Sequence, residues 1–510
     1  MYVFVLAFSK LDYNLASMNV NIIPFQPPLP PVVPTIEGNV DYRIFRDQLL
    51  RIDQLLLEGG LENQFIQTDL QAWSNQNQNL SPKAQQSRQL HCRRALRCNI
   101  ARTLLNEDFR AFAVRLADSL LLQNFCGLST VASVTVPAKS TLQRYAVWWP
   151  EEQVHQLVYQ LVQTGAQQPE KLNLEEPLDL DLSFLDTTCL AANIHYPVDW
   201  VLLRDATRTL MKGVSLIRQQ GLKHRMEPPE QFIRRVNGLC MEMTHAGSKP
   251  QSQRHRKGVF RKIDRLVGTV RGHARRYRDL LDQDWEQTQW TRPQTEQVLR
   301  RIDQVLELLP KARQQARKRI LSGQQVDSKE KILSFYEPDA RVIVRHKAGA
   351  EVEFGNTLLL GETQQGLIVD WKLFKESAPA DARLLLSSLD RIQQAFGQPP
   401  KAVGTDRGFD SQANQAALAQ RRIYNAVCPR APQQLKKRSR SWKFKQLQRR
   451  RGQTEGRVGI LKNNFLGQPL RSKGFERRNL SVSWAVLTHN LWVIARLPQV
   501  EATQANRRAA

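Results

Sequence analysis

The spacing of apolar positions changes along the chain, and each change marks a different kind of secondary structure. From Asp41 to about Phe125, apolar residues recur every three or four positions, which is typical of amphipathic helices. The first helix, at 41–60, is expected to end on Gly59-Gly60. A polar loop at 74–88 separates it from a second helical region, and residues 151–163 indicate another helix. The N-terminal part is therefore predicted to be all-α.

The segment 136–149 predicts a short helix with Ser140 as its N-cap. Polar residues on the first turns of a surface helix are those that a recognition helix presents to base edges and phosphates. A plain structural turn of a helical bundle remains an equal alternative. The residues expected to project from this helix are Thr141, Gln143, Arg144 and Tyr145.

Apolar and polar residues alternate at 178–194, which predicts a strand that runs into Asp186. Residues 200–330 return to long, basic, amphipathic helical segments, interrupted by Pro310 and short polar loops. They are expected to form a helical subdomain of their own. Three further strands joined as a meander are predicted from the segments 332–345, 352–362 and 366–375.

The next stretch alternates helices and strands. A helix at 380–396 leads to a short strand that ends on Asp406, and a helix at 408–422 precedes a strand at 423–430. This strand–helix–strand run is a βαβ unit with Asp406 at the carboxyl end of its first strand. Ligands bind at that edge of open α/β sheets. The chain is therefore predicted to contain an α/β domain with a site at Asp406.

Composition indicates a polyanionic partner. Lys plus Arg number 74 against 48 Asp plus Glu, for a net charge of +26 and a pI near 10.1. Such an excess points to nucleic acid. The six cysteines form no CxxC pair, which argues against a disulfide framework and a structural zinc site. No segment approaches transmembrane length, so a soluble intracellular protein is expected, with Met1 or Met18 as its start.

A basic helix expected at 449–465 carries one acid, Glu455, among five cations. A lone carboxylate in that setting suits a divalent metal beside a phosphate chain. Two-metal phosphoryl transfer needs a few carboxylates that hold two Mg²⁺ ions. The acids expected to do this are Asp186, Asp406 and Glu455, with Glu337 and Asp339 as competitors for the first position.

Other polar residues have simpler interpretations. Asp199, Asp205 and Asp410 are expected to fix turns or pair with arginines, and His195 to be a structural hydrogen-bonder. The run 436–445 interleaves Trp442 and Phe444 with cations. That pattern favours binding of DNA backbone and stacking on an unpaired end over a merely solvated loop.

Several motifs together resemble the DDE transposases of bacterial insertion sequences, in the insertion-sequence-four/five-like and ISNCY-type group. The motifs are LLNEDFRAFAVRLADS, LDTTCLAANIHYPVDWVLLRDA, SFYEPDARVI with VEFG, AVGTDRGFDS and TEGRVGILK. The resemblance covers nearly the whole chain from about residue 40. It implies a Mg²⁺-dependent catalytic domain in which Asp186, Asp406 and Glu455 are the first, second and third acids.

These transposases also carry a Tyr–Arg–Glu–Lys signature around the third acid. Its Arg and Lys positions are Arg451 and Lys462 here, whereas the Tyr position is Gln448. On a helix, 451, 455 and 462 fall on one face, so the two cations are expected to clamp phosphates that flank the metals. The full set of expected DNA contacts is Arg451, Lys462, Arg457, Lys436, Lys437, Trp442 and Arg144.

The resemblance implies an α/β fold with an RNase H-like mixed sheet flanked by helices, interrupted by a helical insertion and preceded by an all-α domain. The insertion accounts for the long interval between Asp186 and Asp406. The expected layout is a flexible Pro-rich lead-in (1–39), a helical DNA-binding domain (40–170), a catalytic domain (171–199 and 331–498), a helical insertion (200–330) and a disordered tail (499–510).

The function implied is cleavage at the ends of an insertion sequence and joining of those ends to target DNA. Expected cofactors are two Mg²⁺ ions, with Mn²⁺ as a substitute. Expected partners are double-stranded DNA (the terminal inverted repeats and the target) and a second copy of the chain for synapsis, in the bacterial nucleoid and without a membrane. No GxxxxGK[ST] P-loop is present, in agreement with a reaction that needs no nucleotide hydrolysis. The alternatives are a catalytically inactive, transposase-derived DNA-binding protein and an RNase H-like nuclease without joining activity.

Overall fold

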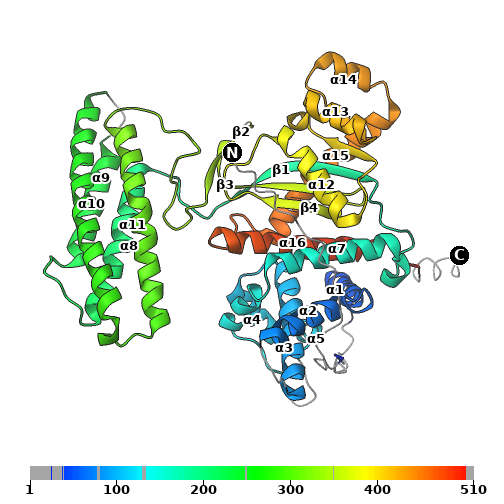
Figure 1. Ribbon diagram of the computed structural model, residues 1–510, viewed down its shortest axis with the longest axis horizontal. Helices are drawn as coiled ribbons and strands as arrows, with labels where there is room; N and C mark the ends of the chain where they lie inside the picture. Colours follow the sequence, from blue (N-terminus) through cyan, green and yellow to red (C-terminus); the bar gives the residue numbers. More distant parts are fainter. Residues whose placement is uncertain are drawn as a thin grey trace. The chain divides into compact units, whose positions relative to one another are not determined.

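A computed structural model describes residues 24–25, 37, 39–76, 81–128, 134–246, 250–347 and 350–500 (Figure 1). The chain divides into two compact units. Unit 1 comprises Met1–Ala101 and Phe109–Trp148, and unit 2 comprises Arg102–Asp108 and Trp149–Ala510. The expected lead-in and tail fall almost entirely outside the described residues. In the described part of the chain, no helix combines the length and apolarity that a membrane crossing needs.

Unit 1 is helical, as the periodicity predicted. Helix α1 ends at Glu58, followed by Gly60 with a φ of +69°. The polar loop is shorter than expected, because α2 continues to Gln76 and α3 already begins at Pro82. The helices are α1 (Val40–Glu58), α2 (Leu61–Gln76), α3 (Pro82–Leu104), α4 (Phe109–Asp118), α5 (Leu120–Phe125) and α6 (Lys139–Ala146).

Arginines of α3 bind carboxylates of the neighbouring helices. Arg97, 1% exposed, contacts Asp53 of α1 and Glu62 of α2, each at 2.5 Å. Arg93 also binds Glu62, at 2.8 Å. Arg88 forms two hydrogen bonds with Asp69, of 2.6 and 2.8 Å. A buried charge is tolerated only when paired and hydrogen-bonded, so these contacts join α1, α2 and α3.

The short helix α6 differs from its prediction in two respects. Its N-cap is Ala138, which makes no side-chain cap hydrogen bond, so Ser140 already lies inside the helix. Tyr145 does not project, because it is only 4% exposed and is buried beside Leu142. Arg144 remains exposed, and it donates a hydrogen bond to Thr141 at 3.1 Å. Of the four residues expected to face outward, Tyr145 is therefore part of the apolar core of unit 1.

Unit 2 contains a six-stranded mixed sheet, so the α/β class is confirmed. The strand order is β2-β3-β1-β5-β6, with β4 also paired to β3. The pairs β1–β3, β2–β3 and β3–β4 are antiparallel, whereas β1–β5 and β5–β6 are parallel. The strands are β1 (Leu182–Ala191), β2 (Arg341–Lys347), β3 (Ala350–Glu362), β4 (Ile368–Leu373), β5 (Ala402–Thr405) and β6 (Tyr424–Val427).

Helices cover both faces of this sheet. On one face, Leu185, Val403 and Val427 share a core with α12 (Leu385–Phe396) and α13 (Gln412–Gln420). On the other face, Phe184, Ala402 and Ala426 pack against Phe444 and Leu447 of α15 (Trp442–Ile460). The alternation along β1 therefore assigns even-numbered residues, including Asp186, to the α15 face.

Two further helices of unit 2 lie beside strand β4. They are α7 (Glu151–Gln167) and α16 (Phe475–Ile494), which pack against each other. The amide of Asn490 on α16 bonds both the N–H and the carbonyl of Ile368, at 2.9 and 2.8 Å. These two bonds satisfy backbone groups at the start of β4. Helix α7, expected in the N-terminal domain, thus belongs with the sheet.

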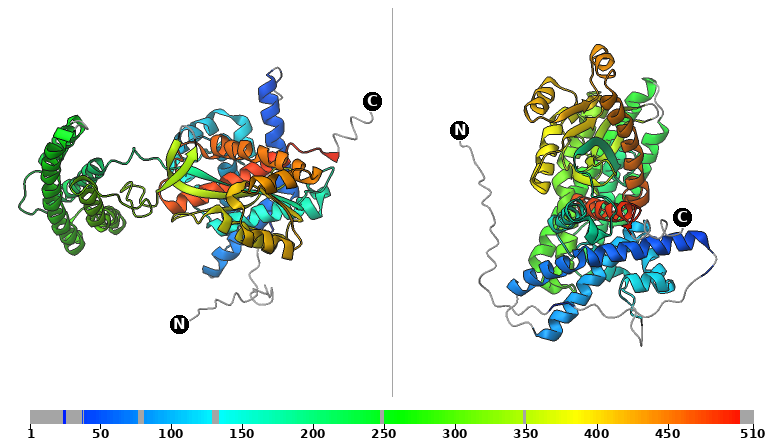
Figure 2. Two further views of the ribbon diagram at one scale, coloured as in Figure 1. Left: turned by 90° about the horizontal axis from the view of Figure 1, so that it is seen from above. Right: turned by 90° about the vertical axis from the view of Figure 1, so that its right-hand side faces the viewer.

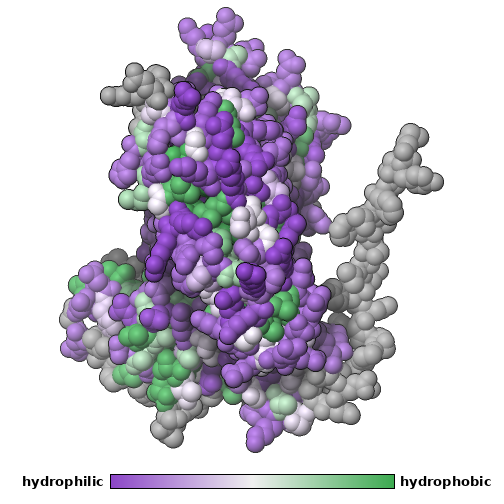
Figure 3. All heavy atoms as spheres, turned by 90° about the vertical axis from the view of Figure 1, so that its left-hand side faces the viewer, coloured by the Kyte–Doolittle hydropathy of each residue, from purple (hydrophilic) through white to green (hydrophobic). Residues whose placement is uncertain are grey.

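The helical segment between β1 and β2 forms a four-helix bundle with its own apolar core, and its helices lie side by side (Figures 1 and 2). The helices are α8 (Asp199–Gln219), α9 (Pro229–His245), α10 (Pro250–Asp284) and α11 (Arg292–Ile320). Pro310 does not interrupt α11, contrary to expectation. Its neighbours Leu309 and Ala312 are buried in the bundle core, and this packing keeps the helix continuous through the missing N–H. In Figure 3 the bundle faces the viewer, and its surface is mainly hydrophilic.

Candidate active site

The register of β1 and β5 brings the first two predicted acids together. Leu185 of β1 pairs with Thr405, the last residue of β5, so Asp186 and Asp406 follow at adjacent positions. The sequence predicted that the strand would end at Asp186. Instead, β1 continues to Ala191 in its antiparallel pairing with β3. The sheet therefore opens at Asp186, where the parallel neighbour stops. Such a point is where ligands bind in α/β sheets.

Helix α15 brings the third acid to the same place and is held there by a buried ion pair. Arg450, 7% exposed, binds Glu362 of β3 at 2.7 Å and also donates to the backbone oxygens of Thr363 and Gln364. Thr454, one turn later, donates to the same Glu362 carboxylate at 2.8 Å. Breaking a buried pair leaves an uncompensated charge, so this anchor fixes the turn between Arg450 and Thr454 against the sheet.

The three predicted acids, Asp186, Asp406 and Glu455, line one cavity of about 380 Å³. The other walls come from β2 and from the loop before α12. Among the residues that the structure describes, no three Asp, Glu, His or Cys side chains lie close enough to hold a metal ion. The acids thus share a cavity without forming a closed ligand cluster.

The electrostatics of Asp186 favour a cation in this cavity. The pKa of Asp186 is raised to about 6, chiefly by burial and also by the charges of Asp406 and Glu455, whereas the Thr187 amide and the charge of Arg451 lower it. The Thr187 amide donates to Asp186 at 2.8 Å. A buried carboxylate near like charges is stabilised by a positive ion. The donor set is made of carboxylate oxygens, which suit a hard cation such as Mg²⁺.

A fourth acid, Asp381, lines the same cavity and was not singled out from the sequence. It accepts a hydrogen bond from the Thr187 hydroxyl at 3.0 Å. A Cβ placed on Gly408 would lie 2.8 Å from an Asp381 oxygen and 3.1 Å from an Asp406 oxygen, so the two carboxylates flank this glycine. The segment APADARL is an ordinary helix start, and no motif distinguishes Asp381 from a capping residue.

Two cations of the predicted signature lie on the same side as the acids. The charge of Arg451 lowers the pKa of Asp186, so the two side chains interact. The Lys462 ammonium donates to the Thr188 hydroxyl at 3.3 Å, and Thr188 shares a strand face with Asp186. Lys462 lies in a π-helical turn, Leu461–Leu466, rather than in α15 itself. Such turns are frequent at functional sites.

Gln448, which replaces the signature tyrosine, connects α15 to the strand ends. Its amide donates to the backbone oxygens of Thr405 and Ala426, at 3.2 and 2.5 Å. These residues belong to β5 and β6, and Thr405 directly precedes Asp406. The glutamine therefore holds α15 against the loop that carries the second acid.

Of the other expected DNA contacts, Arg144 lies on α6 of unit 1, and the remaining ones belong to unit 2. A Cβ on Gly366 would lie 1.2 Å from an Arg457 nitrogen, so that guanidinium covers the turn at Gly366 and is half-buried there. Phe444 is 3% exposed in the sheet core and cannot stack on a DNA end, contrary to expectation. Trp442, by contrast, is 74% exposed. The expected contacts Lys436 and Lys437 are both exposed on α14 (Pro432–Arg438).

Neither competitor for the first position, Glu337 or Asp339, lines the active-site cavity. Glu337 forms a buried ion pair with Arg478 at 2.8 Å. Asp199 binds Arg319 at 2.7 Å, as expected of a pairing carboxylate. Asp410 accepts from the Arg430 amide at 2.9 Å. No family model matches the chain, and it has no match among curated proteins or solved structures.

Proposed function

We propose that this protein is a DDE transposase of an insertion sequence, which binds terminal inverted repeats, cleaves the DNA at the element ends and joins those ends to target DNA. The observation that carries the proposal is the convergence of Asp186, Asp406 and Glu455 on one cavity from three distant segments. The excess of positive charge, +26, supports a DNA partner.

The sheet supports an RNase H-like assignment of the catalytic domain. An antiparallel meander (β1, β3 and β4) is extended by the parallel strands β5 and β6. The bundle is inserted between β1 and β2, so the acids on β1 and after β5 are adjacent in space despite the long interval between them. This arrangement supports the interrupted catalytic domain that we propose from the sequence resemblance.

The acids would hold two Mg²⁺ ions, or Mn²⁺ in their place. When bound, such ions activate the attacking oxygen and stabilise the leaving oxygen of an in-line displacement. Glu455 is exposed, so its side chain is free to rotate toward the aspartates. At neutral pH, Asp186 with its pKa of about 6 is mostly ionised and ready to bind a cation.

The basic residues would position the DNA strand. Arg451 and Lys462 lie beside Asp186 and would bind phosphates on either side of the scissile bond. In the first step, water attacks the phosphodiester at the element end and releases a 3′-OH. In the second, that 3′-OH attacks a target phosphodiester, and the target's own 3′ oxygen leaves. One phosphodiester replaces another, so the joining step consumes no other energy source.

Strand transfer in Mg²⁺ tests this function, with DNA from the flanks of the gene as the source of terminal repeats. Asp406→Asn and Glu455→Gln should each reduce cleavage and joining by at least about a hundredfold, since each removes several kcal/mol of transition-state stabilisation. The matched control is Asp390→Asn, which changes an exposed aspartate outside the cavity, paired with Arg421, and should retain activity.

The assay also separates the alternatives. Equal joining by wild type and both cavity variants would remove the two-metal assignment. Cleavage without joined products would identify a nuclease of the same fold. DNA binding by wild type without either reaction would indicate an inactive, transposase-derived binding protein.

A further inference from the structure

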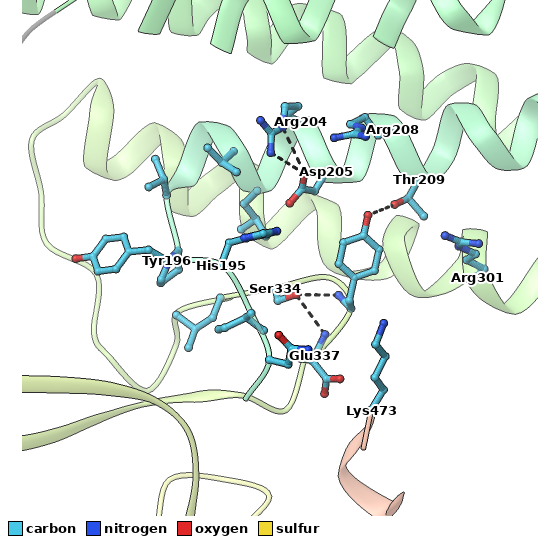
Figure 4. A pocket seen from close by; sticks show the side chains of 18 of the residues that line it. His195, Tyr196, Arg204, Asp205, Arg208, Thr209, Arg301, Ser334, Glu337 and Lys473 are labelled. Atoms are coloured by element: carbon cyan, nitrogen blue, oxygen red, sulfur yellow. Dashed lines mark hydrogen bonds and ion pairs between the residues drawn. The ribbon is translucent and has the colours of Figure 1, made fainter. Parts of the chain in front are cut away.

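A second cavity, of about 310 Å³, lies where β1 leads into the bundle (Figure 4). It is formed by the segment that follows β1, by α8 and α11 of the bundle, and by the loop that precedes β2. Lys473, from the segment before α16, closes it on one side. The cavity shares no lining residue with the one that contains the three acids.

The walls of this cavity are rich in positive charge. The basic residues that line it are Arg204, Arg208, Lys212, Arg301 and Lys473. Two acids also line it, but both are engaged. Asp205 contacts Arg204 at 3.3 Å, and Glu337 binds Arg478 at 2.8 Å and the Gly474 amide at 3.1 Å.

Four of the five cations lack an ion-pair partner in the part of the chain that the structure describes. Within the described ranges, no carboxylate lies at ion-pair distance from Arg208, Lys212, Arg301 or Lys473. Figure 4 shows Arg208 and Arg301 on the bundle side and Lys473 extending from the opposite side. Like charges that line one cavity repel one another, and an anion between them removes that repulsion.

Neutral groups give the cavity a defined shape. The hydroxyls of Thr209 and Tyr336 are hydrogen-bonded at 2.8 Å, which links α8 to the loop before β2. The Ser334 hydroxyl accepts from the amides of Tyr336 and Glu337, at 3.1 and 3.3 Å, so this loop is held in a turn. The cations thus surround a space whose walls are fixed by polar contacts.

We infer that this cavity binds a phosphate group, carried in the working protein by a DNA strand. Two arginines and two lysines suit phosphate, because guanidinium groups bind its oxygens in pairs and ammonium groups add point charge. The volume, at the lower end for small-ligand sites, admits one phosphorylated nucleotide unit. The assignment of a phosphate site stands on the cavity alone, whereas its DNA source rests on the proposed function.

The first arm of the test uses inorganic phosphate and the full chain. Arg208→Gln/Arg301→Gln removes two unpaired cations of the cavity. Lys311→Gln/Lys318→Gln makes the same charge change at exposed positions of α11 that do not line it. Calorimetric titration at constant ionic strength should show saturable phosphate binding to wild type and to the control, and affinity at least tenfold weaker for the cavity variant. No saturable binding to wild type, or equal binding to all three proteins, overturns the site.

The second arm measures the salt dependence of duplex DNA binding for the same three proteins. Each lost phosphate contact reduces the magnitude of the slope of log K against log salt by about 0.9, so the cavity variant, which loses one phosphate contact, should lose about 0.9 relative to wild type. The control should lose less, since its cations do not line the cavity. Lost phosphate binding with an unchanged slope overturns the DNA source and leaves a site for a free phosphate compound. Failure of wild type to bind DNA, with phosphate binding intact, counts against the proposed function and not against the site.

Discussion

Two arginine-rich regions of this molecule use their charge in opposite ways. In unit 1, the α3 arginines bind carboxylates of α1 and α2, and Arg97 is almost completely buried. Arg208 and Arg301 line the cavity beside the bundle, and no carboxylate among the described residues lies at ion-pair distance from either. Both regions are basic helical segments in the sequence. The comparison shows that a run of arginines indicates an anion-binding surface only where the neighbouring elements supply no acids.

The difference has a physical basis in the partner helices. Helices α1 and α2 carry Asp53, Glu62 and Asp69 at positions that face α3, so the arginines gain hydrogen bonds when they leave water. Strong pairing offsets the large cost of burying a guanidinium. At the cavity, Asp205 forms its ion pair with Arg204. The positive charge of the other cations there can therefore bind an external anion.

The largest expected effect comes from breaking the paired region. Glu62→Gln removes the acid shared by Arg93 and Arg97 and leaves buried cations undercompensated. The free energy of unfolding should fall by about 3–5 kcal/mol, measured by urea denaturation. Asp47→Asn, an exposed acid of α1 paired with Arg46, is the control and should change it by no more than about 0.5 kcal/mol. A loss below about 1 kcal/mol for Glu62→Gln would mean that this pairing is not what holds α3.

The buried residue His489 extends the comparison to an ionisable group that has no carboxylate partner among the described residues. The pKa of His489 is lowered to about 4, chiefly by burial; the hydrogen bond with Asn490 opposes this shift, and the charge of Arg457 adds to it. The unfolded chain, with a histidine pKa near 6.5, binds the proton more readily than the fold does. The contribution of His489 to the free energy of unfolding is therefore fully present above pH 6.5, and it is lost as pH falls from 6.5 toward 4. The loss should reach about 3 kcal/mol.

Denaturation of wild type and His489→Gln between pH 7 and pH 4 measures this contribution. The difference in unfolding free energy between the two proteins should change with pH in the direction given above, because glutamine does not titrate. Parallel stability curves would show that His489 keeps its ordinary pKa in the fold.

The smallest effect is expected at the unpaired cations. Arg208→Gln/Arg301→Gln breaks no ion pair and relieves repulsion, so the free energy of unfolding should stay equal or rise by about 0.5 kcal/mol. Thermal unfolding at low salt is the appropriate measurement, since salt screens this repulsion. Substantial destabilisation of the double variant would place these arginines in the same structural class as those of α3.

Much of the sheet could be predicted because strands leave a local pattern. Alternation located β1, and the strand–helix–strand run placed Asp406 just after β5. The meander was also recognised, although the first of its strands begins only at Arg341 and not at Ile332. Local sequence did not reveal where β1 would lose its neighbour. That depends on the pairing of Leu185 with Thr405, which is a long-range contact.

The errors at single residues share one cause, which is that burial is decided by distant segments. Phe444 and Tyr145 were expected to be exposed, because polar residues surround them in the sequence. Both side chains are buried, because residues outside their own helices cover them. In the sequence, Arg450 cannot be distinguished from the other cations of the basic helix. In the structure it forms an ion pair with Glu362 of β3. Asp381 lies far in sequence from the three acids and carried no motif. The roles that we propose for the acids come from the family resemblance, because periodicity carries no information about roles.

The pairing of Leu185 with Thr405 has a consequence for how this site tolerates change. Asp406 lies next to Asp186 because β5 ends one residue before Asp406. The length of β5 therefore sets the alignment of the two acids. Core side chains along β1 and β5 can be exchanged for others of similar volume without moving that end point. A single-residue deletion in β5 would shift Asp406 by one position and turn its side chain to the opposite face of the sheet. The alignment of the acids is therefore far more tolerant of substitution than of insertion or deletion.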